Sequence, residues 1–337
     1  MTEDEIRVER EPSQAREIAR RVFRHENAVL IIVLVALIGG MAGITKGLTI
    51  ARANMTNVLL QSSLRGVAAI GQAFVILSAG IDLSVGGMGL FAAILGGSMT
   101  TLSPWINTVG HPVSPYIVIP LMALVGAGWG VINGSLVSRA GVPALIVTLG
   151  MWQICYGAAF YVCGGREISN HPDTLAFFGT GRVAGVPVPV IIFIVVAVVA
   201  YFVLSYTTFG RSIYAVGGNP VSAWLSGIKV KKVQFMVFVI SGLLAGLSGM
   251  LMLARTLSAT MTTLAGLELD SIAAVCIGGV SLAGGRGSLI GVVIGVLILG
   301  VINNGMSVMA VDPSVQGIVT GAIIITAVAV DVLRRRG

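Results

Sequence analysis

Apolar residues occur along most of the chain in long stretches that short polar or glycine-rich segments separate. A helix that crosses a bilayer needs about 20 mainly apolar residues. Ten stretches approach or reach this length: residues 28–44, 57–80, 84–101, 116–138, 143–163, 187–206, 233–254, 269–283, 288–309 and 315–333. The eighth is short and bounded by glycine, which is typical of a broken or half-spanning helix. The pattern predicts an all-α polytopic membrane bundle of about ten helices.

The composition supports a membrane protein. Only 10% of the 337 residues are charged and 55% are hydrophobic, with a mean hydropathy of +0.96. Soluble domains carry about 25% charged residues, so a soluble protein of this size could not cover its surface. Glycine, with 45 residues, is far above its usual share and lets membrane helices pack closely. The three cysteines have neither metal-ligand nor disulfide spacing, and no motif indicates a cofactor.

The basic residues indicate the orientation of the helices. With the N-terminus in the cytoplasm, fifteen of the 21 Lys and Arg residues fall in cytoplasmic segments and five in external loops, while Arg65 lies within the second stretch. Cytoplasmic loops of membrane proteins carry such an excess, so both termini are expected inside. Two sets of five helices would have opposite topology, an inverted repeat common in transporters. We expect one transmembrane domain over residues 28–337.

The first 27 residues are polar and charged and lack the form of a cleavable signal peptide. They predict a cytoplasmic tail, either a basic amphipathic helix on the inner membrane surface or a charged segment without fixed structure. The net charge of +7 follows from the basic cytoplasmic segments. No basic stripe with interleaved aromatic residues points to nucleic acid.

Asp82 and Ser84 stand where the second apolar stretch meets the third. A carboxylate at membrane depth is costly and is by default a candidate for function. The alternative is structural, because Asp or Ser at the start of an apolar helix can accept backbone N–H bonds as a cap. The residues therefore predict either a gate or a lock at this junction.

Other polar side chains within the stretches also have two interpretations. Arg65 lies in the external half of its helix and either reaches the outer surface or pairs with Glu268 or Asp270. Asn303 and Asn304 could bind a polyhydroxylated solute, or they could join helices. We take these residues, except Glu268, as gate or pathway candidates.

Residues 207–232 form a long, patterned connection on the predicted cytoplasmic side. A plain connector there would be short and polar, whereas this one joins small residues to a short apolar helix. We expect it to dock a soluble partner that supplies mechanical work. The docking candidates are Gly217, Gly218, Asn219, Pro220, Ala223, Trp224, Leu225 and Gly227.

The sequence does not predict an enzyme. Residues 246–249 match the G-x-S-G of intramembrane serine proteases, but such a nucleophile needs an activating base and all three histidines lie in predicted loops. No G-x-x-x-x-G-K-[ST] phosphate loop occurs. The stretches also lack the ionisable pairs of a proton relay, which disfavours a stand-alone secondary carrier or channel but leaves it as an alternative.

Four ordered blocks resemble ribose-type sugar ABC permeases of the branched-chain amino acid and ribose permease superfamily. FVILSAGIDLSVG over residues 74–86 is similar to their signature after the second helix, and residues 210–228 to their cytoplasmic coupling segment. ELDSIAA over 268–274 and IGGVSLAGGRGS over 277–288 are similar to their eighth-helix block, and Asp331 also fits. The resemblance runs from about residue 55 to 333.

The resemblance implies a bacterial inner-membrane importer that moves a monosaccharide or polyol by alternating access. It implies a second permease subunit, an ATPase subunit on which ATP is hydrolysed, and a periplasmic or lipid-anchored solute-binding protein. A nucleoside or branched-chain amino-acid permease is the alternative within the superfamily. Family members often carry charged residues in the coupling helix, where this chain has Val221 and Trp224. A docking salt bridge is therefore in doubt here, and insertion of Trp224 into an apolar groove is the alternative.

Overall fold

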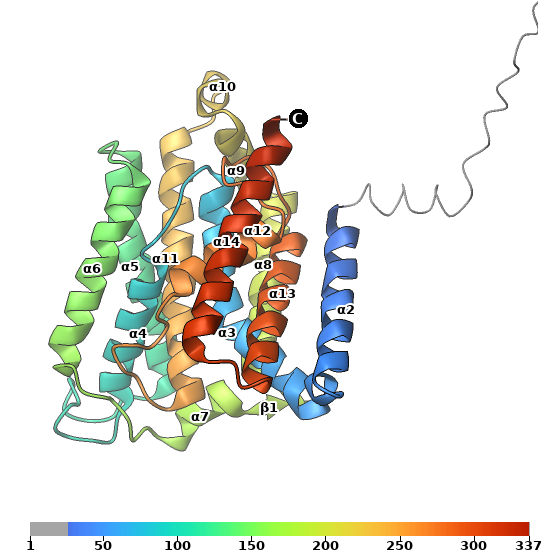
Figure 1. The fold of residues 1–337 in the computed structure, drawn as a ribbon. Helices are drawn as coiled ribbons and strands as arrows, with labels where there is room; N and C mark the ends of the chain where they lie inside the picture. The colour runs from blue at the N-terminus through green and yellow to red at the C-terminus, as the bar shows by residue number, and fades with distance from the viewer. Residues whose placement is uncertain (1–25, 337) are drawn as a thin grey trace, which may run out of the picture.

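The computed structural model describes residues 26–336, and over this part the chain is all-α (Figure 1). One antiparallel hairpin joins the two-residue strands β1 (Arg182–Val183) and β2 (Val186–Pro187). The helices are α2 (Glu26–Ile44), η1 (Leu48–Ile50), α3 (Arg52–Leu77), α4 (Val85–Thr100), α5 (Pro115–Ser138), α6 (Ala144–Cys163), α7 (Asp173–Thr180), α8 (Val188–Tyr206), α9 (Thr208–Gly218), α10 (Pro220–Leu225), α11 (Val230–Thr256), α12 (Leu267–Ile277), α13 (Leu289–Val308) and α14 (Pro313–Arg336). The predicted tail over 1–27 lies almost wholly outside the described residues.

Seven helices of the described part are long and apolar enough to cross a membrane: α2, α3, α5, α6, α8, α11 and α13. The third and eighth predicted stretches correspond to α4 and α12, which have 16 and 11 residues. α12 ends at Ile277 rather than continuing to 283, because Gly278 and Gly279 follow and Gly279 has a positive φ of 81°. The all-α membrane class is confirmed, while the count of ten and the inverted halves stay predictions.

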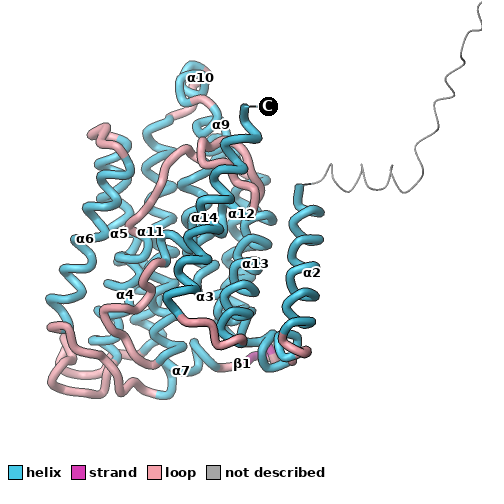
Figure 2. The backbone as a smooth tube through the Cα atoms, viewed as in Figure 1, coloured by secondary structure: helices cyan, strands magenta, loops and turns pink. Residues whose placement is uncertain are grey.

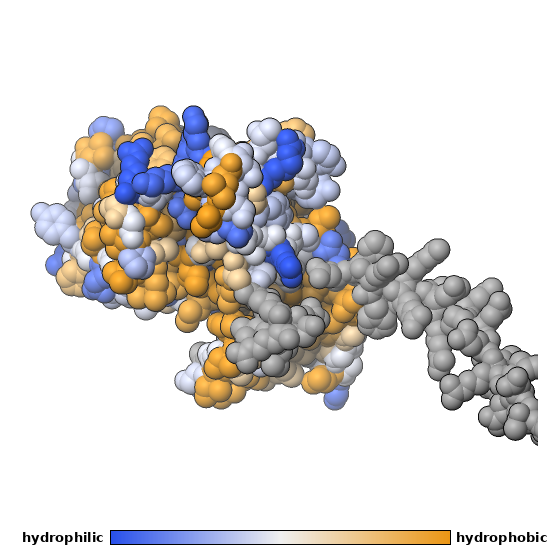
Figure 3. All heavy atoms as spheres, turned by 90° about the horizontal axis from the view of Figure 1, so that it is seen from above, coloured by the Kyte–Doolittle hydropathy of each residue, from blue (hydrophilic) through white to orange (hydrophobic). Residues whose placement is uncertain are grey.

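The helices lie side by side in one bundle with two distinct ends (Figure 1). α10 and the C-terminal end of α14 lie at one end, toward which the described start of α2 also points, and α7 and the hairpin lie at the other. Seen from the α10 end, hydrophilic side chains stand among apolar ones (Figure 3). Figure 2 shows most loops at the two ends, but the loop between α3 and α4 runs into the bundle. This loop carries Asp82.

The centre of the bundle is α11, which packs against α3, α4 and α5. Its contact with α5 is backbone against backbone. A Cβ built on Gly126 would overlap the carbonyl of Gly242, and one built on Gly130 would overlap the carbonyl of Phe238. Glycines spaced four residues apart allow this close approach of membrane helices. The glycine excess in the sequence is thus used where the central helices meet.

Candidate functional site

The segment 207–232 folds as two helices at the α10 end of the bundle (Figure 1). The Thr207 hydroxyl accepts the N–H of Gly210 (3.1 Å) and caps α9. Asn219 separates the helices, and its side chain accepts the N–H groups of Val221 and Ser222, both at 3.0 Å, as an N-cap of α10. Pro220 occupies the first helical position, where its missing N–H costs nothing.

The short helix α10 turns an apolar face away from the protein. Trp224 is 66% exposed, and Val221 and Leu225 are exposed to a similar degree, whereas Ala223 on the opposite side is buried. Gly227 then reverses the chain with a φ of 84°, a conformation that favours glycine. Large apolar side chains gathered on the exposed face of a helix are typical of a surface that binds another protein or a membrane.

Next to α10, helix α9 lies directly against the end of α3 and the loop that follows α12. A Cβ built on Gly217 would overlap the carbonyl of Leu77 and the N–H of Gly285, whereas one on Gly218 would meet nothing within 4 Å. The N–H of Gly285 itself donates to the Leu77 carbonyl (2.9 Å). Segment 207–232 therefore touches both the end of α3 and the loop that follows α12.

Tyr214 makes a second connection to the same loop. Its hydroxyl donates to the carbonyl of Gly287 at 3.1 Å. Burial raises the pKa of the Tyr214 hydroxyl above its ordinary value, since a phenolate would lose hydration. The hydroxyl thus keeps the proton that this bond requires. The sequence does not predict this contact, because nothing in the local pattern distinguishes Tyr214 from a packing residue.

Asp82 is fully buried and lies at the centre of a polar network. One carboxylate oxygen accepts the N–H of Ser84 (3.0 Å) and its hydroxyl (2.5 Å), and the other accepts the hydroxyl of Ser241 on α11 (2.7 Å). The Asn133 amide of α5 donates to the Ser84 hydroxyl at 2.8 Å. Gln72 on α3 bonds the backbone of Asp82 when its amide is oriented to match the backbone groups. The amide nitrogen then donates to the Asp82 carbonyl (3.0 Å), and the amide oxygen accepts the Asp82 N–H (3.3 Å). These bonds support a lock that joins three helices to the loop.

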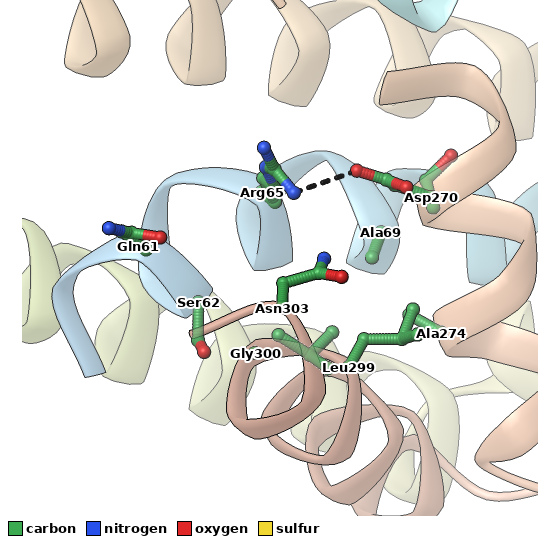
Figure 4. Close-up of a pocket in the computed structure, with 11 residues that line it drawn as sticks. Gln61, Ser62, Arg65, Ala69, Asp270, Ala274, Leu299, Gly300 and Asn303 are labelled. Atoms are coloured by element: carbon green, nitrogen blue, oxygen red, sulfur yellow. Dashed lines mark hydrogen bonds and ion pairs between the residues drawn. The ribbon is translucent and has the colours of Figure 1, made fainter. Parts of the chain in front are cut away.

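Arg65 of α3 and Asp270 of α12 form an ion pair, with 2.9 Å between Nη1 and Oδ2 (Figure 4). The Arg65 side chain is 44% exposed and that of Asp270 19%. Of the two partners that the sequence suggested, Asp270 is therefore the one used. The carboxylate of Glu268 instead lies against Gly86 of α4, where a Cβ would overlap its Oε2.

Two hollows meet at this ion pair. On the α13 side is a crevice between α3, α12 and α13, with Asn303 pointing toward the pair (Figure 4). Its volume of about 30 Å³ leaves room for about two water molecules, each of which needs about 10–15 Å³ of such space. On the other side, the loop 257–266 before α12 borders a hollow of about 340 Å³ that is rich in threonine. This loop was not among the predicted site residues, although its run of hydroxyl residues in an external segment could have marked it.

Asn304 has a different role from its neighbour. Its side-chain amide exchanges two hydrogen bonds with that of Asn54 on α3, at 2.7 and 3.0 Å. This reciprocal pair joins α13 to α3, so Asn304 has the second of its two predicted roles, that of joining helices. We therefore leave Asn304 out of the proposed pathway.

Comparison with known proteins places this arrangement in a family. The family model described as the branched-chain amino acid transport system / permease component matches residues 54–328. The chain belongs to this permease family. Its match extends from the start of α3 into α14 and includes residues 207–232, the Asp82 loop and both partners of the ion pair. It is thus a membrane permease component and not an enzyme.

Individual relatives align with nearly the whole length of this chain. The ribose import permease protein RbsC of Escherichia coli (strain K12) is 37% identical over 92% of this chain and 94% of its own length. The fructose import permease protein FrcC of Rhizobium meliloti is 36% identical over 92% and 86%. The D-allose transport system permease protein AlsC of Escherichia coli (strain K12) is 35% identical over 96% and 97%. No solved structure matches the permease significantly.

Proposed function

We propose that this chain is the membrane permease subunit of an ABC importer that carries a monosaccharide or a closely related polyol into the cytoplasm. The observation that carries this proposal is the full-length similarity to permeases named for ribose, fructose and D-allose import. The three sugars share a polyhydroxylated, uncharged chemistry. The branched-chain amino acid named in the family description makes an amino-acid permease the second candidate.

In this proposal the chain works with three partners. A separate ATPase subunit hydrolyses ATP, a periplasmic or lipid-anchored binding protein delivers the solute, and a second permease subunit, identical or not, completes the pathway. The chain would cross the bacterial inner membrane ten times, with α4, α12 and α14 added to the seven clear spans. The α10 end would face the cytoplasm, consistent with the basic residues on that side.

The apolar face of α10 is the proposed contact with the ATPase. Val221, Trp224 and Leu225 would enter an apolar groove of that subunit, because they are exposed and carry no charge for a salt bridge. The movement of α10 would pass through α9 to the end of α3 at Leu77 and to the loop at Gly285, which α9 touches without intervening side chains. Close backbone contact transmits such displacement, since packed interiors deform little.

The polar residues have separate proposed roles. Asp82 and Ser84 hold the loop between α3 and α4 in one arrangement rather than contacting solute, because their polar atoms are engaged within the protein. Arg65 and Asp270 form a gate toward the outer face, with Asn303 beside it. A gate of this type has to open only once per transport cycle, and a partly exposed ion pair is weak enough to do so.

The test is transport by the reconstituted chain. Proteoliposomes containing the permease with its ATPase and binding protein should accumulate radiolabelled ribose, fructose or allose only when ATP is supplied. Labelled leucine is the control for the amino-acid alternative. Accumulation of leucine but no sugar would replace the proposed substrate class, and uptake by the permease alone would point to a secondary carrier.

A further inference from the structure

We propose that the threonine-rich hollow beside the Arg65–Asp270 pair is a binding site for a neutral, polyhydroxylated solute on the outer side of the gate. This inference rests on the proposed function and names residues that would hold the solute. The hydroxyl residues that line the hollow are Thr256, Ser258, Thr260, Thr262 and Thr263. Its volume of about 340 Å³ lies within the range of about 300–1,000 Å³ typical of small-molecule sites.

The loop that carries these hydroxyls is held in place before any solute arrives. Ile168 and Ala259 exchange two backbone hydrogen bonds, both 2.9 Å, which tie the loop to the segment after α6. The hydroxyl of Thr263 accepts the N–H of Thr260 at 2.9 Å, which shapes the turn leading to α12. A site of this kind loses little conformational entropy on binding, because its backbone is already ordered.

Two of the hydroxyls keep hydrogen-bonding capacity for a ligand. The Thr260 and Thr262 hydroxyl oxygens lie 2.9 Å apart, so one donates to the other. The hydroxyl that accepts still has its own hydrogen to donate, and both oxygens retain lone pairs. A solute with several hydroxyl groups can both accept a hydrogen bond from these threonines and donate one to them.

The ion pair at the edge of the hollow adds charged groups that also keep unused hydrogen-bond donors and acceptors. The contact between Arg65 and Asp270 uses one guanidinium nitrogen and one carboxylate oxygen. The fork of an arginine has five N–H donors, and a carboxylate has about four acceptor positions. The pair is neutral in sum, so it favours a neutral ligand with neighbouring hydroxyls over an anion or a cation. Met252 and Ala265, which also line the hollow and are not buried, offer apolar surface to the C–H faces of such a solute.

The crevice on the other side of the pair cannot take this solute in the described conformation. Its volume of about 30 Å³ has room for about two water molecules, whereas that of the hollow is about 340 Å³. The two hollows share only Arg65 and Asp270 among their lining residues. The solute would therefore wait in the threonine-rich hollow until the pair rearranges.

The proposal is tested with the complete importer in proteoliposomes, by measuring solute imported per ATP hydrolysed. In the double variant Thr260→Val, Thr262→Val, import per ATP should fall about threefold or more, since a lost hydrogen bond costs about 0.5–1.5 kcal/mol. ATPase stimulation by the loaded binding protein should stay at the wild-type level, because α10 is unchanged. Thr260→Ser with Thr262→Ser keeps both hydroxyls and should restore the ratio.

Thr180→Val is the matched control, because Thr180 is an exposed residue of α7 that does not line the hollow and whose hydroxyl bonds its own helix at Ala176. It should leave import and ATPase activity unchanged. An unaltered ratio in the valine double variant would overturn the site while leaving the sugar importer intact. The same loss in the serine variant, or in Thr180→Val, would also overturn it. A wild-type complex that imports no sugar would instead reject the proposed function.

Discussion

Removing the carboxylate of Asp82 is the most direct test of the buried polar network. Asp82→Ala leaves three donors without their acceptor: the N–H and hydroxyl of Ser84, and the hydroxyl of Ser241. An unsatisfied buried donor costs about 1–3 kcal/mol. Part of this is offset because the costly burial of the carboxylate is also removed. We therefore expect a net loss of about 3 kcal/mol in the free energy of unfolding.

Asp82→Asn should be much milder. The asparagine keeps an oxygen for Ser84, and its amide nitrogen can donate to the Ser241 hydroxyl after that hydroxyl turns. A heating series followed by size-exclusion chromatography in detergent measures the apparent unfolding midpoint. At about 2–4 °C per kcal/mol, Asp82→Ala should lower it by roughly 6–12 °C, and Asp82→Asn by less than half of that shift.

Ser248→Ala is the matched control for this experiment. Ser248 lies on α11 two turns after Ser241 and is also fully buried, but its hydroxyl donates to the Leu64 carbonyl (2.6 Å) and not to Asp82. Its loss should cost about one hydrogen bond, 0.5–1.5 kcal/mol. Equal shifts for Asp82→Ala and Ser248→Ala, or for Asp82→Ala and Asp82→Asn, would refute the network as a lock.

Three further predictions follow from the coupling segment and the gate. Trp224→Ala should reduce ATP-driven uptake in proteoliposomes about tenfold or more with unchanged expression, as for a central interface aromatic; wild-type uptake would exclude insertion of this side chain into the ATPase. Gly217→Val should lower the apparent melting midpoint, because its Cβ overlaps the Leu77 carbonyl, while Gly218→Ala, which meets open space, should not; equal midpoints would contradict the close seat of α9. Reversing the ion pair with Arg65→Asp and Asp270→Arg together should restore more uptake than either single change permits; additive losses would show that the pair does not act as a unit.

Much of the architecture could be predicted from the chain because the bilayer imposes a length on each apolar stretch. The predicted stretch 187–206 differs from α8 by one residue at its start, and 143–163 differs from α6 by the same amount. The eighth stretch was too long, since its end depends on the φ of Gly279 and not on hydropathy. The four motif blocks were sufficient to indicate the permease family, which the comparisons confirmed.

The candidate site was predicted only in part. The short apolar helix expected within residues 207–232 is present as α10, whereas the small residues before it, which were expected to form a loop, fold as helix α9. That this segment docks a partner stays a prediction. The loop 257–266 was missed. Its run of hydroxyl residues was a visible signal, but only the packed structure shows that these residues line a hollow. Asn303 and Asn304 are adjacent in the sequence, yet one borders the crevice and the other joins α13 to α3, because successive helical residues point about 100° apart.

The sequence by itself determined the membrane class, the positions of most helices and the family. These properties depend on local composition and spacing, because the apolar bilayer requires each spanning segment to be an apolar helix with its own backbone hydrogen bonds. Only the tertiary structure decided that Arg65 pairs with Asp270, 205 residues away, and that Asp82 bonds Ser241 across 159 residues. Such contacts depend on how closely the helices approach one another. That distance is set by glycine-to-backbone packing between helices, which no single stretch of the chain contains.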